Sequence, residues 1–418
     1  MFNRYPHFLL CAVLLFVLLP LLASCSSETG PKLDWKSDLE LVRREFPEKE
    51  ITLKQNPRLA EDFKERITAI IGKLPKYRND DEVKLELSGA LASLGQVHTF
   101  LAFTREPLLP FNLYIQEGKV YVLGTVAGYR DTLYSELTAI EGVPVEQILE
   151  KLKKDISRDN EVGLWARAPM YLRMPSVLKG LRVIEDTEKV ELTFKKEDGQ
   201  IISINAETLT EANHSKPEFA EYMPAQQFMQ NFKHADSNYQ YEYMASAKAM
   251  YIAYNSCEQD KNLSMLQFTG GLLHAARQQP IDRLIIDLRN NSGGDSSVIQ
   301  PLLDTLSQNP ELARHMLVLT SRTTASSAMD TAMVLRSAFQ AILIGEPTNG
   351  DPNKPGNILP LKLPATGLTA YYCTTEYHNP LYLGQDAVPP DLPVPTTIED
   401  FRAGVDPVMQ AALDYKFQ

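Results

Sequence analysis

The strongest constraint on the fold is a regular alternation of apolar strands and amphipathic helices from Tyr241 to the end of the chain. The run "RLIIDLR" is apolar between its charged ends, as in a parallel strand that is buried on both faces. Helical patterns precede and follow it in "LSMLQFTGGLLHAARQQ" and "DSSVIQPLLDTLSQN", and the strands "HMLVLTS" and "AILIGEPT" flank a further helix. Such alternation predicts an α/β fold, with helices packed on a parallel or mixed sheet.

Two smaller units precede this core in a chain of 418 residues, which is long enough for more than one domain. Residues 33–104 have helical apolar patterns and end in the strand "TFLAF". Residues 105–205 combine alternating stretches, a hairpin turn at Asp198-Gly199 and the strand, turn and helix of "ELTAIEGVPVEQILEKLKKDI". The predicted division is a leader (1–24), a tether (25–32), a helical domain (33–104), a small α+β module (105–205), a linker or covering segment (206–240) and the core (241–418).

The N-terminus has the features of an export signal. Arg4 precedes the apolar run "FLLCAVLLFVLLPLL", which is short for a membrane-spanning helix of about 20 residues. The following "LASC" resembles the bacterial lipoprotein box, in which the cysteine carries the lipid. This resemblance implies that Cys25 is lipidated and that the protein is anchored to a membrane of the bacterial envelope, inner or outer. The alternatives are an ordinary signal peptide and a short anchor.

Composition excludes several classes of function. A formal net charge of −11 and a pI of about 5.3 argue against nucleic acid as a partner, because phosphate binding needs clustered Lys and Arg. The apolar share of 44% and the charged share of 23% are typical of a soluble globular protein. Cys257 and Cys373 lack metal-ligand spacing, and we expect buried apolar residues there, although a disulfide between them stays open. No metal or cofactor is expected.

Three stretches contain candidate catalytic residues, and two of them follow predicted strands, where sites form in α/β sheets. In "LIIDLRNNSGGDSS" a strand runs into Gly293 and Gly294, whose backbone N–H groups suit an anion or oxyanion; a plain tight turn is the alternative. In "RTTASSAMDTAM" Ser326 and Ser327 stand where a helix begins. Taken alone, a serine there is more often a helix cap than a nucleophile. His98, in "LGQVHTFL", is the third; a nucleophilic serine needs such a base, but a lone histidine is more often structural.

These stretches together resemble the tail-specific (C-terminal-processing) and tricorn-like serine peptidases, most of all the exported tricorn-like branch. The motifs concerned are "LIIDLRNNSGGDS", "TASSAMD", "AILIGEPTNG" and "VPPDLPVPTTIEDFRAGVDPVMQAAL", with "LASLGQVHT" further upstream. The resemblance covers about residues 33–415, and it implies a crotonase-like ββα fold for the catalytic core.

The resemblance also implies roles for individual residues. Ser326 matches the nucleophile and His98 the base of the tricorn-like branch. Gly293 or Gly294, with the backbone N–H of Ser327, matches the oxyanion hole. A helix start and a glycine turn both offer N–H donors, so elementary chemistry agrees with these assignments.

The sequence departs from the family pattern at several positions. The base of the C-terminal-processing branch is a lysine directly after its "GExTxG" element, but Asp351 stands there and Lys354 is out of register. The tricorn-like histidine follows Asp-Gly, whereas here Gln-Val precedes His98. The orienting acid has no clear match, and Asp386 and Glu376 are the nearest candidates, each with a solvated loop acid as the alternative. The stretch "LTAIEGVPVEQILEKL" resembles a PDZ-like domain weakly, and a plain α+β spacer is as well supported.

The sequence therefore predicts an exported, lipid-anchored serine endopeptidase acting on peptides or polypeptides. It would form an acyl-enzyme on Ser326, with His98 as general base. The alternatives are a binding lipoprotein on the same scaffold that lacks activity, and a small-ester hydrolase that uses the same site. The oligomeric state is not indicated.

Overall fold

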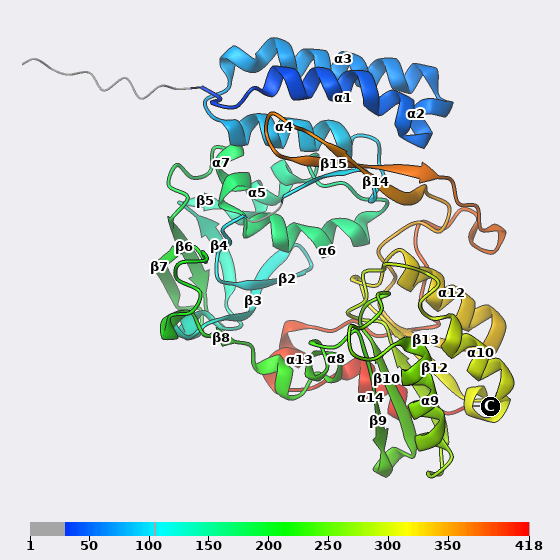
Figure 1. Cartoon of the computed structure of the whole chain (residues 1–418). Helices are drawn as coiled ribbons and strands as arrows, with labels where there is room; N and C mark the ends of the chain where they lie inside the picture. The colour runs from blue at the N-terminus through cyan, green and yellow to red at the C-terminus, as the bar shows by residue number, and fades with distance from the viewer. Residues whose placement is uncertain (1–29, 104–105, 418) are drawn as a thin grey trace, which may run out of the picture.

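A computed structural model describes residues 30–103 and 106–417. The predicted leader and the proposed lipidation site at Cys25 lie outside the described residues. The fold has an N-terminal helical unit, an α+β module and a C-terminal α/β core, which occupy the top, left and lower right of Figure 1. No helix in the described part of the chain is long and apolar enough to cross a membrane.

The helical unit begins its helices at side-chain caps. Asp34, Asn56 and Asn79 each accept a backbone N–H of the first turn, and three acidic residues follow Asn79, where the helix dipole favours negative charge. The elements are α1 (Trp35–Lys49), α2 (Ile51–Gln55), α3 (Pro57–Lys73), α4 (Asp80–Ala92) and the short strand β1 (Phe100–Ala102).

A hairpin from the far end of the chain completes this unit. Strands β14 (Gly356–Lys362) and β15 (Thr369–Thr375) form a three-stranded sheet with β1, in the order β1-β15-β14. Leu363, Ala370 and Tyr372 lie in the same buried cluster as the apolar faces of α1, α3 and α4. The hairpin, drawn in orange in Figure 1, therefore packs on the helices of the N-terminal unit, although it belongs to the segment 241–418. The predicted domain limits stay predictions, and the β14–β15 hairpin of the core segment packs with the helical unit.

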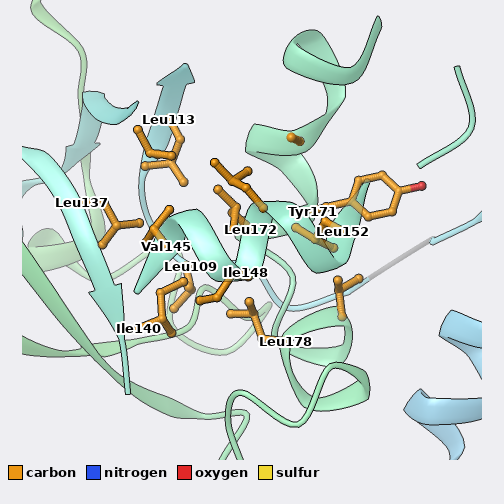
Figure 2. Close-up of a cluster of buried hydrophobic side chains, with 14 of the residues drawn as sticks. Leu109, Leu113, Leu137, Ile140, Val145, Ile148, Leu152, Tyr171, Leu172 and Leu178 are labelled. Atoms are coloured by element: carbon orange, nitrogen blue, oxygen red, sulfur yellow. The ribbon is translucent and has the colours of Figure 1, made fainter. Parts of the chain in front are cut away.

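The α+β module is a twisted antiparallel sheet covered by helices. Its main path is β2-β3-β4-β6-β7, and its apolar centre is shown in Figure 2, where Leu137 and Ile140 of the sheet face Val145, Ile148 and Leu172 of the helices. The Glu117-Gly118 turn joins β2 to β3, and the predicted hairpin at Asp198-Gly199 joins β6 to β7. The PDZ-like interpretation is not confirmed. The elements are β2 (Asn112–Gln116), β3 (Lys119–Val126), β4 (Glu136–Ile140), β5 (Val143–Pro144), α5 (Val145–Leu152), α6 (Glu161–Leu172), α7 (Pro175–Gly180), β6 (Lys189–Lys195) and β7 (Ile201–Glu207).

The segment 206–240 covers the junction between the module and the core. It contains β8 (Glu221–Tyr222), which pairs with β3, and the single helical turn α8 (Gln230–Lys233). Ala225 and Met229 pack with Leu123 of the module and with Phe401 near the C-terminus. The irregular sequence therefore forms a packed cover.

The core is a six-stranded sheet in the order β16-β13-β12-β11-β10-β9. All neighbours are parallel except the edge strand β9, which is antiparallel to β10. The strands are β9 (Tyr239–Met244), β10 (Ala249–Tyr254), β11 (Arg283–Asp287), β12 (Met316–Thr320), β13 (Ile342–Gly345) and β16 (Leu392–Pro393). The helices are α9 (Met265–Ala276), α10 (Gln300–Gln308), α11 (Pro310–Ala313), α12 (Ser327–Phe339), α13 (Ile398–Ala403) and α14 (Pro407–Asp414).

Helices cover both faces of this sheet, which explains why its strands are continuously apolar. Met250, Ile286 and Val318 face α9, α10 and α12, while the alternate residues Ile285 and Leu317 face α14. The predicted α/β core is thus confirmed. Cys257 and Cys373 are buried and form no disulfide, in agreement with the prediction of buried apolar residues.

Candidate active site

The candidate site lies at the carboxyl ends of the parallel strands. Because β11, β12 and β13 run in the same direction, the segments that follow them meet at one edge of the sheet. The Gly293-Gly294 turn follows β11, Ser326 follows β12, and Asn349 follows β13. Backbone pairing joins the last two segments, since Ala325 pairs with Asn349 and the Asn349 N–H donates to Thr324 O over 2.9 Å.

Ser326 precedes α12 in the position of a helix cap, but its side chain does not act as a cap. Its backbone angles are φ 50° and ψ −130°, a combination that costs about 1–3 kcal/mol in a residue other than glycine. The Ser326 hydroxyl is half-buried and makes no hydrogen bond within the described residues. The sequence left open whether Ser326 caps the helix, and the structure shows no capping hydrogen bond from its side chain.

The glycine turn lies directly against Ser326. Gly293 has φ 110°, and a Cβ on it would lie 2.7 Å from the Ser326 Cβ and 3.2 Å from its Oγ. Gly294 has φ 136°, and a Cβ on it would lie 2.5 Å from Cys257 O. Only glycine allows both approaches.

The turn and the start of α12 contain backbone donors that have no partner among the described residues. The Gly293 N–H donates to Asn291 Oδ1 over 2.9 Å, so it is already occupied. Neither the Gly294 N–H nor the Ser327 N–H makes a hydrogen bond within the part of the chain that the structure describes. Of the three predicted oxyanion residues, these two retain a free N–H. The Ser327 N–H also lies at the N-terminus of α12, the positive end of the helix dipole.

The Ser327 side chain holds the turn and the helix together. Its hydroxyl donates to Gly294 O over 2.7 Å and accepts from the Ser296 hydroxyl over 2.8 Å. The two neighbouring serines thus differ, because within the described residues the Ser327 hydroxyl is hydrogen-bonded and the Ser326 hydroxyl is not.

A buried ion cluster fixes the end of β11 beneath the site. The Arg289 guanidinium contacts the carboxylates of Asp287 over 2.8 Å and Asp406 over 2.7 Å. Tyr251 donates to Asp287 Oδ2 over 2.9 Å. Burial alone would lower the pKa of Arg289, but the two carboxylates hold it well above its usual range, so the cation persists. Asp406 also anchors the covering segment by accepting the Gln230 N–H.

His98 is in the turn between α4 and β1, at the joint of the helical unit with its hairpin. Its Nδ1 atom is buried and has no hydrogen-bond partner among the described residues, and the Pro355 carbonyl lies near the ring. Burial, with the neighbouring Arg167 cation, lowers the pKa of His98 from 6.5 to about 4. The imidazole is therefore neutral at pH 7. No hydrogen bond joins it to Ser326 in the described structure.

The two predicted acids are solvent-exposed, and neither carboxylate is hydrogen-bonded to His98 within the described residues. The Asp386 backbone oxygen accepts from Asn160 Nδ2, and Glu376 lies in the loop after β15. Their role as an orienting acid stays a prediction. Lys354 is half-buried and its cation is near the Asp159 carboxylate; burial raises the pKa of Asp159, and this cation acts in the opposite direction.

Sequence reasoning missed two charged residues around the His98 loop. Arg167, on α6, is near the His98 ring and over the ring of Phe100, with 5.9 Å between the guanidinium carbon and the ring centroid. Asp159, before α6, accepts the Val97 N–H over 2.6 Å and the Asp351 N–H over 3.1 Å. Both belong to the α+β module, and no local motif indicates their contacts.

A cavity of about 550 Å³ opens beside the strand ends. Its walls are apolar residues of β2 and α6 together with the covering segment, and its polar side is formed by Asn290, Ser321 and Arg322 at the ends of β11 and β12. Arg322 crosses from the core to the module, where it pairs with Glu346 and donates to Ile115 O and to the Tyr114 hydroxyl. Ser326 and His98 do not line the cavity, so it adjoins the reacting groups without containing them.

No family model and no curated protein matches this sequence. Solved structures do resemble it. A mutant form of CPAF has 12% sequence identity and a TM-score of 0.62, with 92% of this chain and 99% of that chain covered. Mature CPAF complexed with lactacystin has 14% identity and a TM-score of 0.60, over 91% of this chain and 97% of that one. The photosystem II D1 C-terminal processing protease is more distant, at 14% identity and a TM-score of 0.45, over 86% and 92% of the two chains. The fold expected from the sequence is thus confirmed: over most of its length, the chain has the fold of CPAF.

Proposed function

We propose that this protein is a serine peptidase with Ser326 as its nucleophile. The observation that supports this most is the conformation of Ser326 itself. Its backbone is strained, and among the described residues neither its hydroxyl nor the nearby Gly294 and Ser327 N–H groups make a hydrogen bond. Backbone strain of this kind is found where function requires a fixed side-chain direction.

In the proposed reaction the Ser326 oxygen attacks the carbonyl carbon of the scissile peptide bond. Its proton passes to the neutral imidazole of His98, and the Gly294 and Ser327 N–H groups stabilise the oxyanion. The imidazolium then protonates the leaving amine, and an acyl-enzyme on Ser326 remains. Water, deprotonated by His98, hydrolyses this ester and restores both groups.

The proposed mechanism requires a change on substrate binding. His98 and Ser326 make no hydrogen bond in the described structure, and catalytic hydrogen bonds often form only in the substrate complex. Protonation of His98 is costly while Arg167 lies beside it and the ring is buried. A substrate that brings Ser326 to the ring would favour the imidazolium through the developing negative charge.

The proposed substrate is a polypeptide, which would enter from the cavity beside the strand ends. The apolar walls of that cavity, formed by residues such as Leu113, Met170 and Phe232, suit apolar side chains next to the scissile bond. A small ester would need no such extended contact. Comparison of peptide and ester hydrolysis by the same preparation therefore distinguishes a peptidase from an esterase.

The decisive experiment replaces Ser326 and compares it with a serine that is a true cap. Ser264 begins α9 in a full capping box. We expect Ser326→Ala to abolish peptide hydrolysis and labelling by a fluorophosphonate probe. Ser264→Ala should cost about 1 kcal/mol of stability and leave the activity unchanged. Lactacystin, found in a complex with mature CPAF, is a second probe. Absence of a covalent adduct on the wild-type protein would favour the binding lipoprotein.

We also propose that the protein is exported and held at a membrane of the bacterial envelope by a lipid on Cys25. The basis is the leader and the "LASC" motif in the sequence. Cys25→Ser should abolish incorporation of a clickable fatty acid and release the protein from the membrane fraction. Unchanged fractionation of that variant would contradict the anchor.

A further inference from the structure

We infer that Asp159 is a positioning residue that joins the His98 loop to the loop beside Ser326. This inference rests on the proposed function, since it concerns how the base is held relative to the nucleophile. Asp159 touches neither reacting group, and its effect would pass through the two backbone segments that it binds.

The first support is geometric. Asp159 Oδ1 accepts the N–H of Val97, the residue before His98, over 2.6 Å, and Oδ2 accepts the Asp351 N–H over 3.1 Å. Asp351 lies in the same loop between β13 and β14 as Asn349, and Asn349 is paired with Ala325, the residue before Ser326. One carboxylate therefore binds the residue before His98 and the loop that pairs with the residue before Ser326.

The residues around Asp159 bind the same two regions. The Ser157 hydroxyl donates to Thr99 O over 2.7 Å, on the other side of His98. Asn160 Nδ2 donates to Asp386 O over 2.6 Å and approaches Thr348 O at 3.5 Å, while Asn160 Oδ1 caps α6. Residues 157–160, which we name the staple segment, thus hold both flanks of His98 and the loop after β13. Because the segment is fixed to a helix, it is a rigid support.

The charge of Asp159 suits this role. An ionised carboxylate has only acceptors, so each oxygen can take one backbone N–H, whereas an amide has a single acceptor oxygen. Burial raises the pKa of Asp159, and the two N–H donors and the Lys354 cation act in the opposite direction. Burial lowers the pKa of Arg167, and the nearby Asp159 carboxylate acts in the opposite direction.

The experiment compares two replacements of Asp159 with a matched control. Asp38 is buried, whereas Asp159 is half-buried, and it also accepts two backbone N–H groups, those of Ala365 and Thr366, but it holds the far turn of the β14–β15 hairpin. In the full-length protein we expect Asp159→Ala to lower kcat about 10- to 100-fold with KM changed little, because a displaced base affects the chemical step. Asp159→Asn, which keeps one acceptor, should lie between Asp159→Ala and the wild type. Asp38→Asn should reduce stability without changing kcat.

A second measurement does not depend on activity. Hydrogen exchange of the Val97 and Asp351 amides should become about 10- to 100-fold faster in Asp159→Ala, as expected for loss of hydrogen bonds to a charged acceptor. The Asp38 variant should leave both amides protected.

The outcomes separate the inference from the proposed function. A normal kcat in Asp159→Ala, or an equal fall of kcat in the Asp38 variant, would overturn the positioning role. If the wild-type protein shows no hydrolysis that depends on Ser326, the proposed function fails. Exchange of the Val97 and Asp351 amides then decides alone whether Asp159 holds the two loops. Faster exchange of both amides in Asp159→Ala then supports the link between the two loops, and unchanged exchange refutes it.

Discussion

The close approach of the glycine turn to Ser326 makes Gly293→Ala the sharpest test of the site. The added Cβ would lie 2.7 Å from the Ser326 Cβ and 3.1 Å from Ala325 O, and neither of these atoms is the end of a flexible side chain. Either the turn or the start of α12 has to move. Any such movement shifts the hydroxyl relative to the free N–H donors of Gly294 and Ser327.

The size of the effect follows from two separate contributions. The φ of 110° at Gly293 is unfavourable for alanine and costs about 1–3 kcal/mol of folding stability. The displacement of the nucleophile adds a kinetic effect, and a shift of about 1 Å is expected to lower kcat/KM about 100-fold. Urea unfolding measures the first contribution, and peptide hydrolysis the second.

Gly199→Ala is the control for backbone strain alone. Gly199 has φ 84° in the β6–β7 turn, and a Cβ on it would have no atom within 4 Å. This variant should lose about 1 kcal/mol of stability and keep its full kcat/KM. If Gly293→Ala also keeps its kcat/KM, the contact between the glycine turn and Ser326 has no part in catalysis, and the proposed site is wrong.

Three further predictions concern ionisable groups. Burial lowers the pKa of His98 from 6.5 to about 4, so on acidification the unfolded chain binds a proton before the folded protein does. The free energy of unfolding should therefore decrease as the pH falls below 6.5, by up to about 1.36 kcal/mol per pH unit and by about 3 kcal/mol in total at pH 4. Urea unfolding at pH 7 and pH 4 should show this loss in the wild type and not in His98→Gln. Asp406→Asn leaves the buried Arg289 cation with one carboxylate fewer and should cost about 3–5 kcal/mol in the same assay. Arg322→Lys loses the planar contact with Glu346 and the reach to the module, and should raise KM more than it changes kcat.

The core could be predicted from the sequence because its signals are local. Helices cover both faces of the sheet, so each strand is an uninterrupted apolar run, and polar residues follow at the strand ends. The glycine pair and the serine pair are in those segments. Their roles could be proposed before the geometry was known, because a turn that approaches another backbone closely requires glycine.

The remaining features depend on contacts between residues far apart in the chain. Asp159 is 62 residues from Val97 and 192 residues from Asp351, and no spacing rule indicates that one carboxylate binds both. The free hydroxyl of Ser326 also could not be predicted, since a capping serine has the same local sequence pattern. Motif position alone points to Asp386 and Glu376, and it does not indicate their exposure to solvent, which depends on the fold.

The β14–β15 hairpin gives a physical reason why the core and the helical unit have to act together. The chain leaves the core after the Asn349 loop, passes Pro355 beside the His98 ring, and enters β14. Strand β15 then pairs with β1, with Tyr371 opposite Phe100, two residues after His98. The segment that follows the nucleophile in the sequence therefore supplies β15, the strand that pairs with β1 directly after the His98 turn. A change in β15 at the residues that pair with β1, even far from Ser326, should alter the position of His98 through this pairing. The helical unit without residues 356–375 would lack β15, which pairs with β1, and β14, which pairs with β15, together with part of its own apolar core.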